Sequence, residues 1–304
     1  MLGALACSDS LHPGHILHKL STAQTGLLLL TIGAVIDSSS GLFTRLITAD
    51  NFTVASGRSL AAFACLICAL AIRERGRIWP SFAGIGKAGI AFALLNGAGM
   101  VMTILSLRHT SVANFFMISA TAPFVAGLLG WLILRERLDR ATALAALAGF
   151  AGIAIMMTGK TTANGQFGDL LALACVLTYS AIVLLTRGAR FDILPVIALT
   201  CLVSGLMPLP WADFASLTLP DASILFLFGA VQIAIGNLFI FAAASRIPPA
   251  QSGLLGVFNA ALAPLWVFLA LGDVPATASL IGGGIVLAAA IAHLGYTLSR
   301  PQHP

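Results

Sequence analysis

Hydrophobic residues in this chain gather in long runs that are separated by short polar stretches. Ten such runs lie at residues 25–47, 52–72, 88–107, 112–134, 141–159, 168–185, 194–210, 222–244, 249–271 and 276–298. At ~1.5 Å rise per residue, each run is long enough to cross the hydrocarbon core of a bilayer as an α-helix. The pattern therefore predicts an all-α integral membrane protein with ten transmembrane helices.

The composition of the chain supports the same class. Of the 304 residues, 59% are hydrophobic and 9% are charged, whereas soluble domains are about 45–50% apolar and about 25% charged. The net charge of +5 could suit nucleic acid, but the cations lie between the apolar runs, where they act as orientation signals. We expect a lipid bilayer, and no nucleic acid, as the partner.

Lysines and arginines divide unevenly between the two sides of the membrane. With the N-terminus inside, that side holds Lys19, Arg73, Arg75, Arg77, Lys87, Arg135, Arg137, Arg140, Arg187, Arg190, Arg246 and Arg300. The other side holds only Arg45, Arg108 and Lys160. Because cytoplasmic loops are enriched in cations, residues 1–23 and 300–304 are expected to be cytoplasmic tails. The chain is then a multi-pass protein of the cell inner or plasma membrane.

The two halves of the chain repeat. A shift of 137 residues places Glu136 on Asp273 and Pro123 on Ala260. The first repeat then covers residues 24–160 and the second covers residues 161–299, with five helices each. Because five is odd, the second unit crosses the membrane in the opposite sense. This predicts two inverted five-helix repeats, an arrangement that secondary transporters use for alternating access.

One acidic residue, Asp37, lies deep in an apolar run, while the others lie in tails, loops or helix ends. An ionised carboxylate near the bilayer centre costs roughly 2.5–3.5 kcal/mol on insertion scales, so it needs a partner or a use. Arg58 is the one deep cation, and its side chain could reach Asp37 from the next helix. Two interpretations stay open: a structural ion pair, or a site for substrate or protons.

Other polar side chains near mid-depth could line a cavity together, although each alone could simply bond a neighbouring helix. The candidate substrate-binding or coupling residues are Asp37, Ser38, Arg58, Asn96, Tyr179, Asn237 and Asn259. The sequence contains no HExxH zinc motif, no GxSxG nucleophile motif and no P-loop. We therefore expect no catalytic residue, no metal and no cofactor.

A family resemblance rests on the motif TAPFVAGLLGWLILRER, which a Gly-rich helix follows. This stretch resembles the EamA family of the drug/metabolite transporter superfamily. SSSGLFTRLI followed by GRSLAAF is similar to the first two helices of one subgroup, with Arg45 and Arg58 in matching places. Two positions depart, since Asp37 replaces a usual tryptophan and Asn259-Ala260 replaces a frequent Glu-Pro. The resemblance implies a ten-helix exporter of small metabolites, commonly amino acids or related polar compounds.

The leading functional prediction is a secondary-active transporter that exports a small polar metabolite by alternating access. Protons are the candidate coupling ion, and the protein is expected to be a monomer or a loose homodimer. The alternatives are a multidrug or other metabolite facilitator without proton coupling, an intramembrane enzyme and a channel. An enzyme would need a nucleophile or zinc motif within the helices, and a channel would need filter residues repeated by oligomeric symmetry.

The uneven distribution of cations generates a topological prediction. Both termini are expected to face the cytoplasm, because inverting the chain would place most of its lysines and arginines on the translocated side. Reporter fusions at each terminus measure this directly, using one reporter active only in the cytoplasm and one active only outside. A terminus that activates the external reporter would contradict the orientation.

Overall fold

The computed structural model of the chain describes residues 22–135, 140–158, 163–185, 191–247, 254–272 and 275–299. Several residues used in the predictions above lie outside these ranges, namely Lys19, Glu136, Arg137, Lys160, Arg187, Arg190, Asp273 and Arg300. Most of the two expected tails lies outside them as well.

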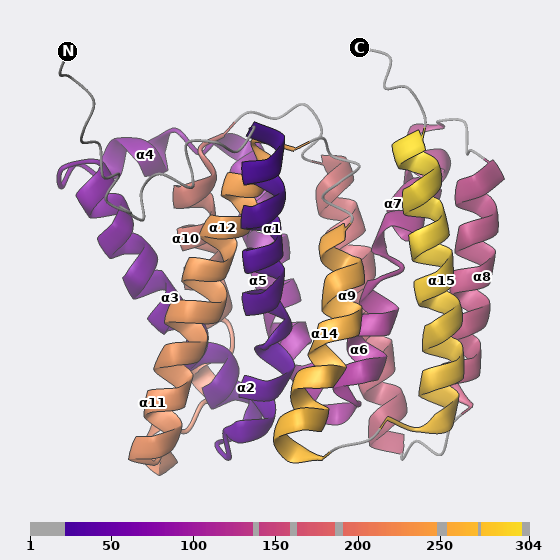
Figure 1. Cartoon of the computed structure of the whole chain (residues 1–304). Coiled ribbons are helices and arrows are strands. Elements are labelled where there is room, and N and C mark those ends of the chain that lie inside the picture. Colours follow the sequence, from indigo (N-terminus) through magenta and orange to yellow (C-terminus); the bar gives the residue numbers. More distant parts are fainter. Residues whose placement is uncertain are drawn as a thin grey trace, which may run out of the picture.

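Helices form wherever the apolar runs predict them (Figure 1). The first half contains α1 (Thr22–Ser38), α2 (Ser40–Leu46), α3 (Asn51–Arg73), α4 (Trp79–Ala83), α5 (Gly86–His109), α6 (Val112–Ser119), α7 (Ala122–Leu134) and α8 (Arg140–Met157). The second half contains α9 (Ala163–Leu185), α10 (Ile193–Leu206), η3 (Leu209–Trp211), η4 (Phe214–Ser216), α11 (Leu219–Leu227), η5 (Phe228–Ile235), α12 (Gly236–Ala244), α14 (Leu254–Leu271) and α15 (Thr277–Ser299).

These elements group into membrane spans. Eight helical segments of the described chain are long and apolar enough to cross a bilayer, including Gln24–Leu46, which joins α1 and α2, and Leu219–Ala243, which joins α11, η5 and α12. The pair α6 and α7 makes one further span with a 40° bend, and α14 is a shorter apolar helix. Together they correspond to the ten expected transmembrane helices, so the predicted fold class is confirmed. In chain order, spans 1 to 5 are α1 with α2, α3, α5, α6 with α7, and α8, and spans 6 to 10 are α9, α10, α11 with η5 and α12, α14, and α15.

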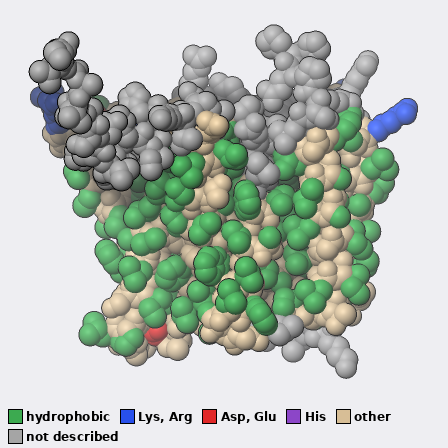
Figure 2. Space-filling model, viewed as in Figure 1, with side chains coloured by type: hydrophobic (Ala, Val, Ile, Leu, Met, Phe, Trp, Pro, Cys, Tyr) green, Lys and Arg blue, Asp and Glu red, His purple; other side chains and the backbone are tan. Residues whose placement is uncertain are grey.

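The surface of the bundle agrees with a membrane environment. Figure 2 shows hydrophobic side chains spread over the visible face, while the charged side chains in view lie near its upper and lower margins. Large apolar side chains on α7, α8 and α15 are more than half exposed, for example Leu132, Leu147 and Ile281. In water such a surface would be a liability, whereas lipid tails solvate it without cost.

α1 begins and α15 ends at the same end of the bundle, the upper end in Figure 1. We call this the terminal end and the opposite one the far end. Successive spans run alternately between the two ends, so α1 and its counterpart α9 run in opposite directions. The second half is therefore inverted relative to the first.

Helix packing follows the same two-fold relation. If spans 1 to 5 are exchanged with spans 6 to 10, the packing of α5 on α9 maps onto that of α1 on α12. The packing of α5 on α10 likewise maps onto that of α3 on η5, and α7 on α9 maps onto α1 on α14. The pairs α3 with α10 and α8 with α15 map onto themselves. The two halves thus interlock through equivalent contacts rather than lying apart as separate bundles.

Glycines set how closely the spans approach each other. α8 and α15 cross at Gly152 and Gly282, where a Cβ on Gly152 would lie 2.6 Å from the carbonyl oxygen of Gly282. A Cβ on Gly282 would in turn overlap the carbonyl oxygen of Gly152 and would lie 2.6 Å from Cγ of Met156. Small residues allow this approach, which is how helices gain packing energy inside a bilayer.

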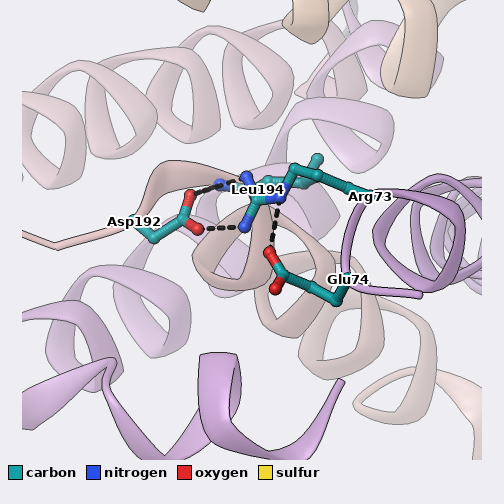
Figure 3. Close-up of polar contacts among 4 residues, drawn as sticks. All are labelled: Arg73, Glu74, Asp192 and Leu194. Carbon is teal, nitrogen blue, oxygen red and sulfur yellow. Dashed lines mark hydrogen bonds and ion pairs between the residues drawn. The ribbon is translucent and has the colours of Figure 1, made fainter. Parts of the chain in front are cut away.

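At the terminal end, an ion pair links α3 to the start of α10 (Figure 3). The guanidinium of Arg73 donates hydrogen bonds to both carboxylate oxygens of Asp192, and Arg73 Nε donates to Glu74 Oε1 at 2.8 Å. Asp192 Oδ1 also accepts a hydrogen bond from Leu194 N at 3.2 Å, which caps α10. The hydrogen bond from Arg73 holds the pKa of Asp192 below its usual range.

The crossing of α8 and α15 generates a stability prediction with a matched control on the same helix. Gly282→Ala should lower the thermal unfolding temperature in detergent, because its Cβ would meet backbone atoms of α8 that cannot move aside. Gly284→Ala should have no such effect, because a Cβ there meets nothing within 4 Å. Equal unfolding temperatures for the two variants would contradict the observed crossing.

The Asp192 contact generates a pH prediction. Because the pKa of Asp192 is lower in the folded chain than in the unfolded one, its stabilisation is present above the unfolded value of ~3.9 and is lost as the pH falls through the folded value. Asp192→Asn should therefore lower the unfolding temperature at pH ~7. The loss of unfolding free energy behind this shift should be no more than the ~1 kcal/mol of an exposed ion pair. The deficit should shrink toward pH ~3. A deficit that is constant across this range would contradict the ion-pair origin.

Candidate functional site

A cavity of about 590 Å³ lies inside the bundle between the two halves. It runs from Asp37 and Arg58 to Leu255 and His293, and the last two lie close to the terminal end because α14 begins and α15 ends there. Its volume falls within the roughly 300–1,000 Å³ of small-molecule sites, and its walls are mostly apolar with a few polar groups. The cavity therefore has the size and lining of a binding site for one small molecule.

Asp37 lies at the end of α1, where a run of serines interrupts the first span. Ser38 Oγ donates to the carbonyl oxygen of Val35 at 2.9 Å, and Ser39 Oγ donates to that of Ile36 at 2.5 Å. Serine hydroxyls that bond the preceding turn loosen and bend a helix. The regular hydrogen-bond pattern of the helix is interrupted at Ser39, whose N–H donates to the carbonyl oxygen of Ile36 at 3.2 Å before α2 begins, so Asp37 lies beside a tightened turn at mid-span.

Two amide side chains hold the carboxylate of Asp37. Gln232 Nε2 donates to Oδ1 at 2.8 Å, and Asn259 Nδ2 donates to Oδ2 at 2.7 Å. Both partners belong to the second half, on η5 and α14, whereas Asp37 belongs to the first. We call these three residues the Asp37 cluster. The cluster joins the two repeats across the cavity wall.

The expected contact between Asp37 and Arg58 is not formed. In the described part of the chain the ion pairs are those of Arg73 with Glu74 and Asp192, so the carboxylate of Asp37 and the guanidinium of Arg58 lie more than 4.0 Å apart. The distance along the helices would have allowed a pair, but the amides occupy the donor positions around Asp37 instead. The interpretation of the two charges as a structural ion pair is therefore wrong for this conformation.

Arg58 has a different environment, at the middle of α3. Its side chain is 3% exposed and lies with the guanidinium carbon 5.0 Å from the ring centre of Phe228, a cation–π contact. One terminal nitrogen donates to the carbonyl oxygen of Met100 at 2.7 Å, and Nε has no hydrogen-bond partner among the described residues. The guanidinium is thus buried at the cavity without a carboxylate to neutralise it.

Span 8 is wound as a π-helix over Phe228–Ile235, and Gln232 lies within this segment. In a regular α-helix, residues five apart point about 140° away from each other, so Gln232 and Asn237 would face different sides. The wider π-turn lets both side chains line the cavity. Sequence reasoning selected Asn237 and missed Gln232 as a site residue, because the π-helix has no signature in the hydrophobic pattern.

Gly229 allows the π-helix to lie directly against α3. A Cβ at this position would overlap the carbonyl oxygen of Arg58 and would lie 2.7 Å from Cβ of Ala61. This close approach brings the Phe228 ring over Arg58 and, one turn further along, places Gln232 beside Asp37. Gly229 therefore allows span 8 to lie close enough to α3 for the Phe228 ring to contact Arg58.

Span 4 is broken beside the cavity. α6 ends at Ser119, and α7 begins at Ala122 with Pro123 in its first turn, where the missing N–H of proline costs nothing. Ser180 Oγ on α9 donates to the carbonyl oxygen of Ala122 at 3.2 Å and so satisfies a backbone group at the break. Irregular backbone at membrane depth is tolerated where it lines a cavity, and Ser119 and Pro123 do line this one.

The structure places six of the seven candidate residues at the cavity. Its lining includes Asp37, Arg58, Asn96, Tyr179, Asn237 and Asn259. Ser38 is the exception, because it is fully buried and accepts a hydrogen bond from Trp266 Nε1 at 3.0 Å, between α1 and α14. Ser40, two residues further along, lines the cavity instead.

At the far end the bundle is tied together by polar contacts between the halves. Thr110 Oγ1 and Asn114 Nδ2 donate to Asp169, which is fully buried at the start of α9. Thr48 Oγ1 donates to Asp221 Oδ2 at 2.6 Å. The sequence placed both aspartates near helix ends, but it gave no sign that they are buried. Together with the apolar cluster around Ile47, Val54 and Leu225, these contacts close the far end.

Ten spans in two inverted halves around a mostly apolar cavity with a few polar groups define a multi-pass membrane protein with transporter architecture. The chain belongs to the EamA-like transporter family, whose model matches residues 24–158 and 166–294. A crystal structure matches with a TM-score of 0.63 and 19% identity, over 90% of this chain and 98% of its own. At this identity the match shows a shared fold. No curated protein matches the chain.

Proposed function

We propose that the protein is a secondary-active transporter that exports a small polar metabolite, an amino acid or a related compound, by alternating access. The closed far end and the cavity directed toward the terminal end support this proposal, because they correspond to one of the two states that alternating access requires. With the termini in the cytoplasm, this state receives its substrate from inside the cell.

The observation that carries the proposal is the Asp37 cluster. Its carboxylate belongs to the first repeat and both hydrogen-bond donors belong to the second. If the repeats rock against each other, the donors move relative to the carboxylate, and the surroundings of Asp37 change with the state of the transporter. A coupling group needs this dependence, because it has to hold a proton in one state and release it in the other.

Amide partners suit this role better than a cation would. An arginine paired with Asp37 would favour the ionised carboxylate in every state. An amide can donate through its nitrogen to a carboxylate, or accept through its oxygen from a carboxylic acid after a simple flip of the group. The side-chain oxygens of Gln232 and Asn259 have no hydrogen-bond partner among the described residues, so they are available to a protonated Asp37.

The second candidate is a facilitator without proton coupling, in which the Asp37 cluster only fixes the interface between the repeats. The family membership favours a transporter over an intramembrane enzyme or a channel, but it does not choose between coupled and uncoupled transport. The two candidates differ in one measurable property, which is whether movement of substrate drives movement of protons.

Asp37→Asn separates them. Proteoliposomes that enclose a pH-sensitive dye receive a mixture of L-amino acids on one side, and both internal pH and uptake of labelled amino acids are followed. The wild type should show proton movement that depends on the amino acids. Asp37→Asn should lose it while keeping exchange of labelled amino acids across the membrane, because an amide cannot take up a proton near neutral pH.

The matched control is Asp213→Asn, which removes an exposed aspartate at the far end, outside the cavity. It should behave as the wild type does in both measurements. Proton movement that persists at the full rate in Asp37→Asn would contradict the coupling role and would favour the facilitator.

A further inference from the structure

The charges on the cavity wall are not compensated equally. Among the lysines, arginines, aspartates and glutamates that the structure describes, only Asp37 and Arg58 belong to the cavity lining. Asp37 accepts one charge-assisted hydrogen bond at each carboxylate oxygen. Arg58 donates one hydrogen bond, to a neutral backbone carbonyl, and otherwise contacts the face of an aromatic ring. The positive charge is therefore the one that lacks a partner.

So few hydrogen-bond acceptors are unusual for an arginine that is so deeply buried. A guanidinium carries five N–H donors in a planar fork, and its two-point geometry matches a carboxylate. Arg58 is 3% exposed, and the described residues provide one acceptor for those donors. Burying a charge is costly unless it is paired and hydrogen-bonded. Nε in particular is enclosed and has no acceptor among the residues that the structure describes.

The surroundings hold Arg58 at the cavity rather than allowing it to turn away. The Phe228 ring stacks on Phe43 with ring centres 5.2 Å apart, which fixes the aromatic surface under the guanidinium. The carbonyl of Met100 fixes one terminal nitrogen from α5. Gly229 brings the π-helix against the backbone of Arg58 itself. The guanidinium is thus preorganised at its place in the wall, which lowers the entropic cost of binding an anion there.

We infer that Arg58 is the anchoring residue for a carboxylate group of the transported molecule, so that this cavity selects compounds that carry a carboxylate over their uncharged or purely cationic analogues. The inference rests on the proposed transport function and specifies how the substrate is held. It also assigns the two cavity charges to different roles, with Arg58 binding the substrate anion and Asp37 serving the coupling step.

Matched sets of ligands test the selectivity without a known substrate. For each of a range of side chains, the L-amino acid, its carboxamide and its decarboxylated amine are added to purified protein in detergent, and the shift in thermal unfolding temperature is titrated. The wild type should be stabilised by the acids of at least one set. The acid concentration that gives half of the maximal shift should be about tenfold to hundredfold lower than that of the matching amide and amine. Amides or amines that bind as well as the acids would overturn the inference. So would the absence of stabilisation by every acid.

Variants of Arg58 connect the selectivity to this side chain. Arg58→Gln should remove the preference for acids over amides, and Arg58→Lys should keep part of it, because lysine retains the charge without the planar fork. The matched control is Arg108→Gln. Arg108 also has an unpartnered Nε, but its guanidinium donates to the backbone carbonyls of Ile47 and Ala49 outside the cavity. This control should leave the preference unchanged.

The outcome remains decisive if a variant folds poorly. The acid, amide and amine comparison on the wild type alone can overturn the inference, and Arg58→Lys is the milder change. Transport is measured separately, by counterflow of a labelled acid that binds. An acid that binds through Arg58 but is not moved across the liposome membrane would contradict the transporter proposal and leave the anion site standing. If amides and acids were transported with the same half-saturating concentration, this result would contradict the anion site but not the transporter proposal.

Discussion

A charged group inside a membrane protein has to find its stabilisation within the protein, because the bilayer core supplies no water. Asp37 imposes this constraint on spans 1, 8 and 9. Its carboxylate needs donors at mid-depth, and they come from Gln232 and Asn259. Two hydrogen bonds therefore link span 1 to spans 8 and 9 at mid-depth, in addition to the packing of α1 on α12 and α14.

The irregular helices of the bundle gather around this constraint. The serine interruption at the end of α1, the π-helix of span 8 and the break in span 4 all border the same cavity. By contrast, α8 and α15 are unbroken helices and pack through Gly152 and Gly282. Three departures from a regular helix are thus concentrated where a ligand in the cavity would meet the chain.

The sequence could predict the features that depend on local pattern. Ten spans follow from the apolar runs, and the inversion of the halves follows from five crossings each. Asp37 is identifiable because a deep acid is rare. The missing features depend on side-chain direction and on distant segments. Gln232 needs a π-helix to face the cavity, Arg58 turns to Met100 and Phe228 instead of Asp37, and the burial of Asp169 depends on Thr110 in the other half.

The contacts at the two ends of the bundle differ in a way that bears on alternating access. At the far end, two hydrogen bonds join the repeats: the bond from Thr110 to Asp169 is buried, and the bond from the exposed Thr48 to the buried Asp221 is partly buried. At the terminal end, the pair of Arg73 and Asp192 is exposed. A net contribution of about 1 kcal/mol for each hydrogen bond is comparable to the few kcal/mol that separate functional states of a protein. In the transport cycle proposed above, a small set of such contacts is enough to favour the closed far end, yet weak enough for binding in the cavity to reverse the preference.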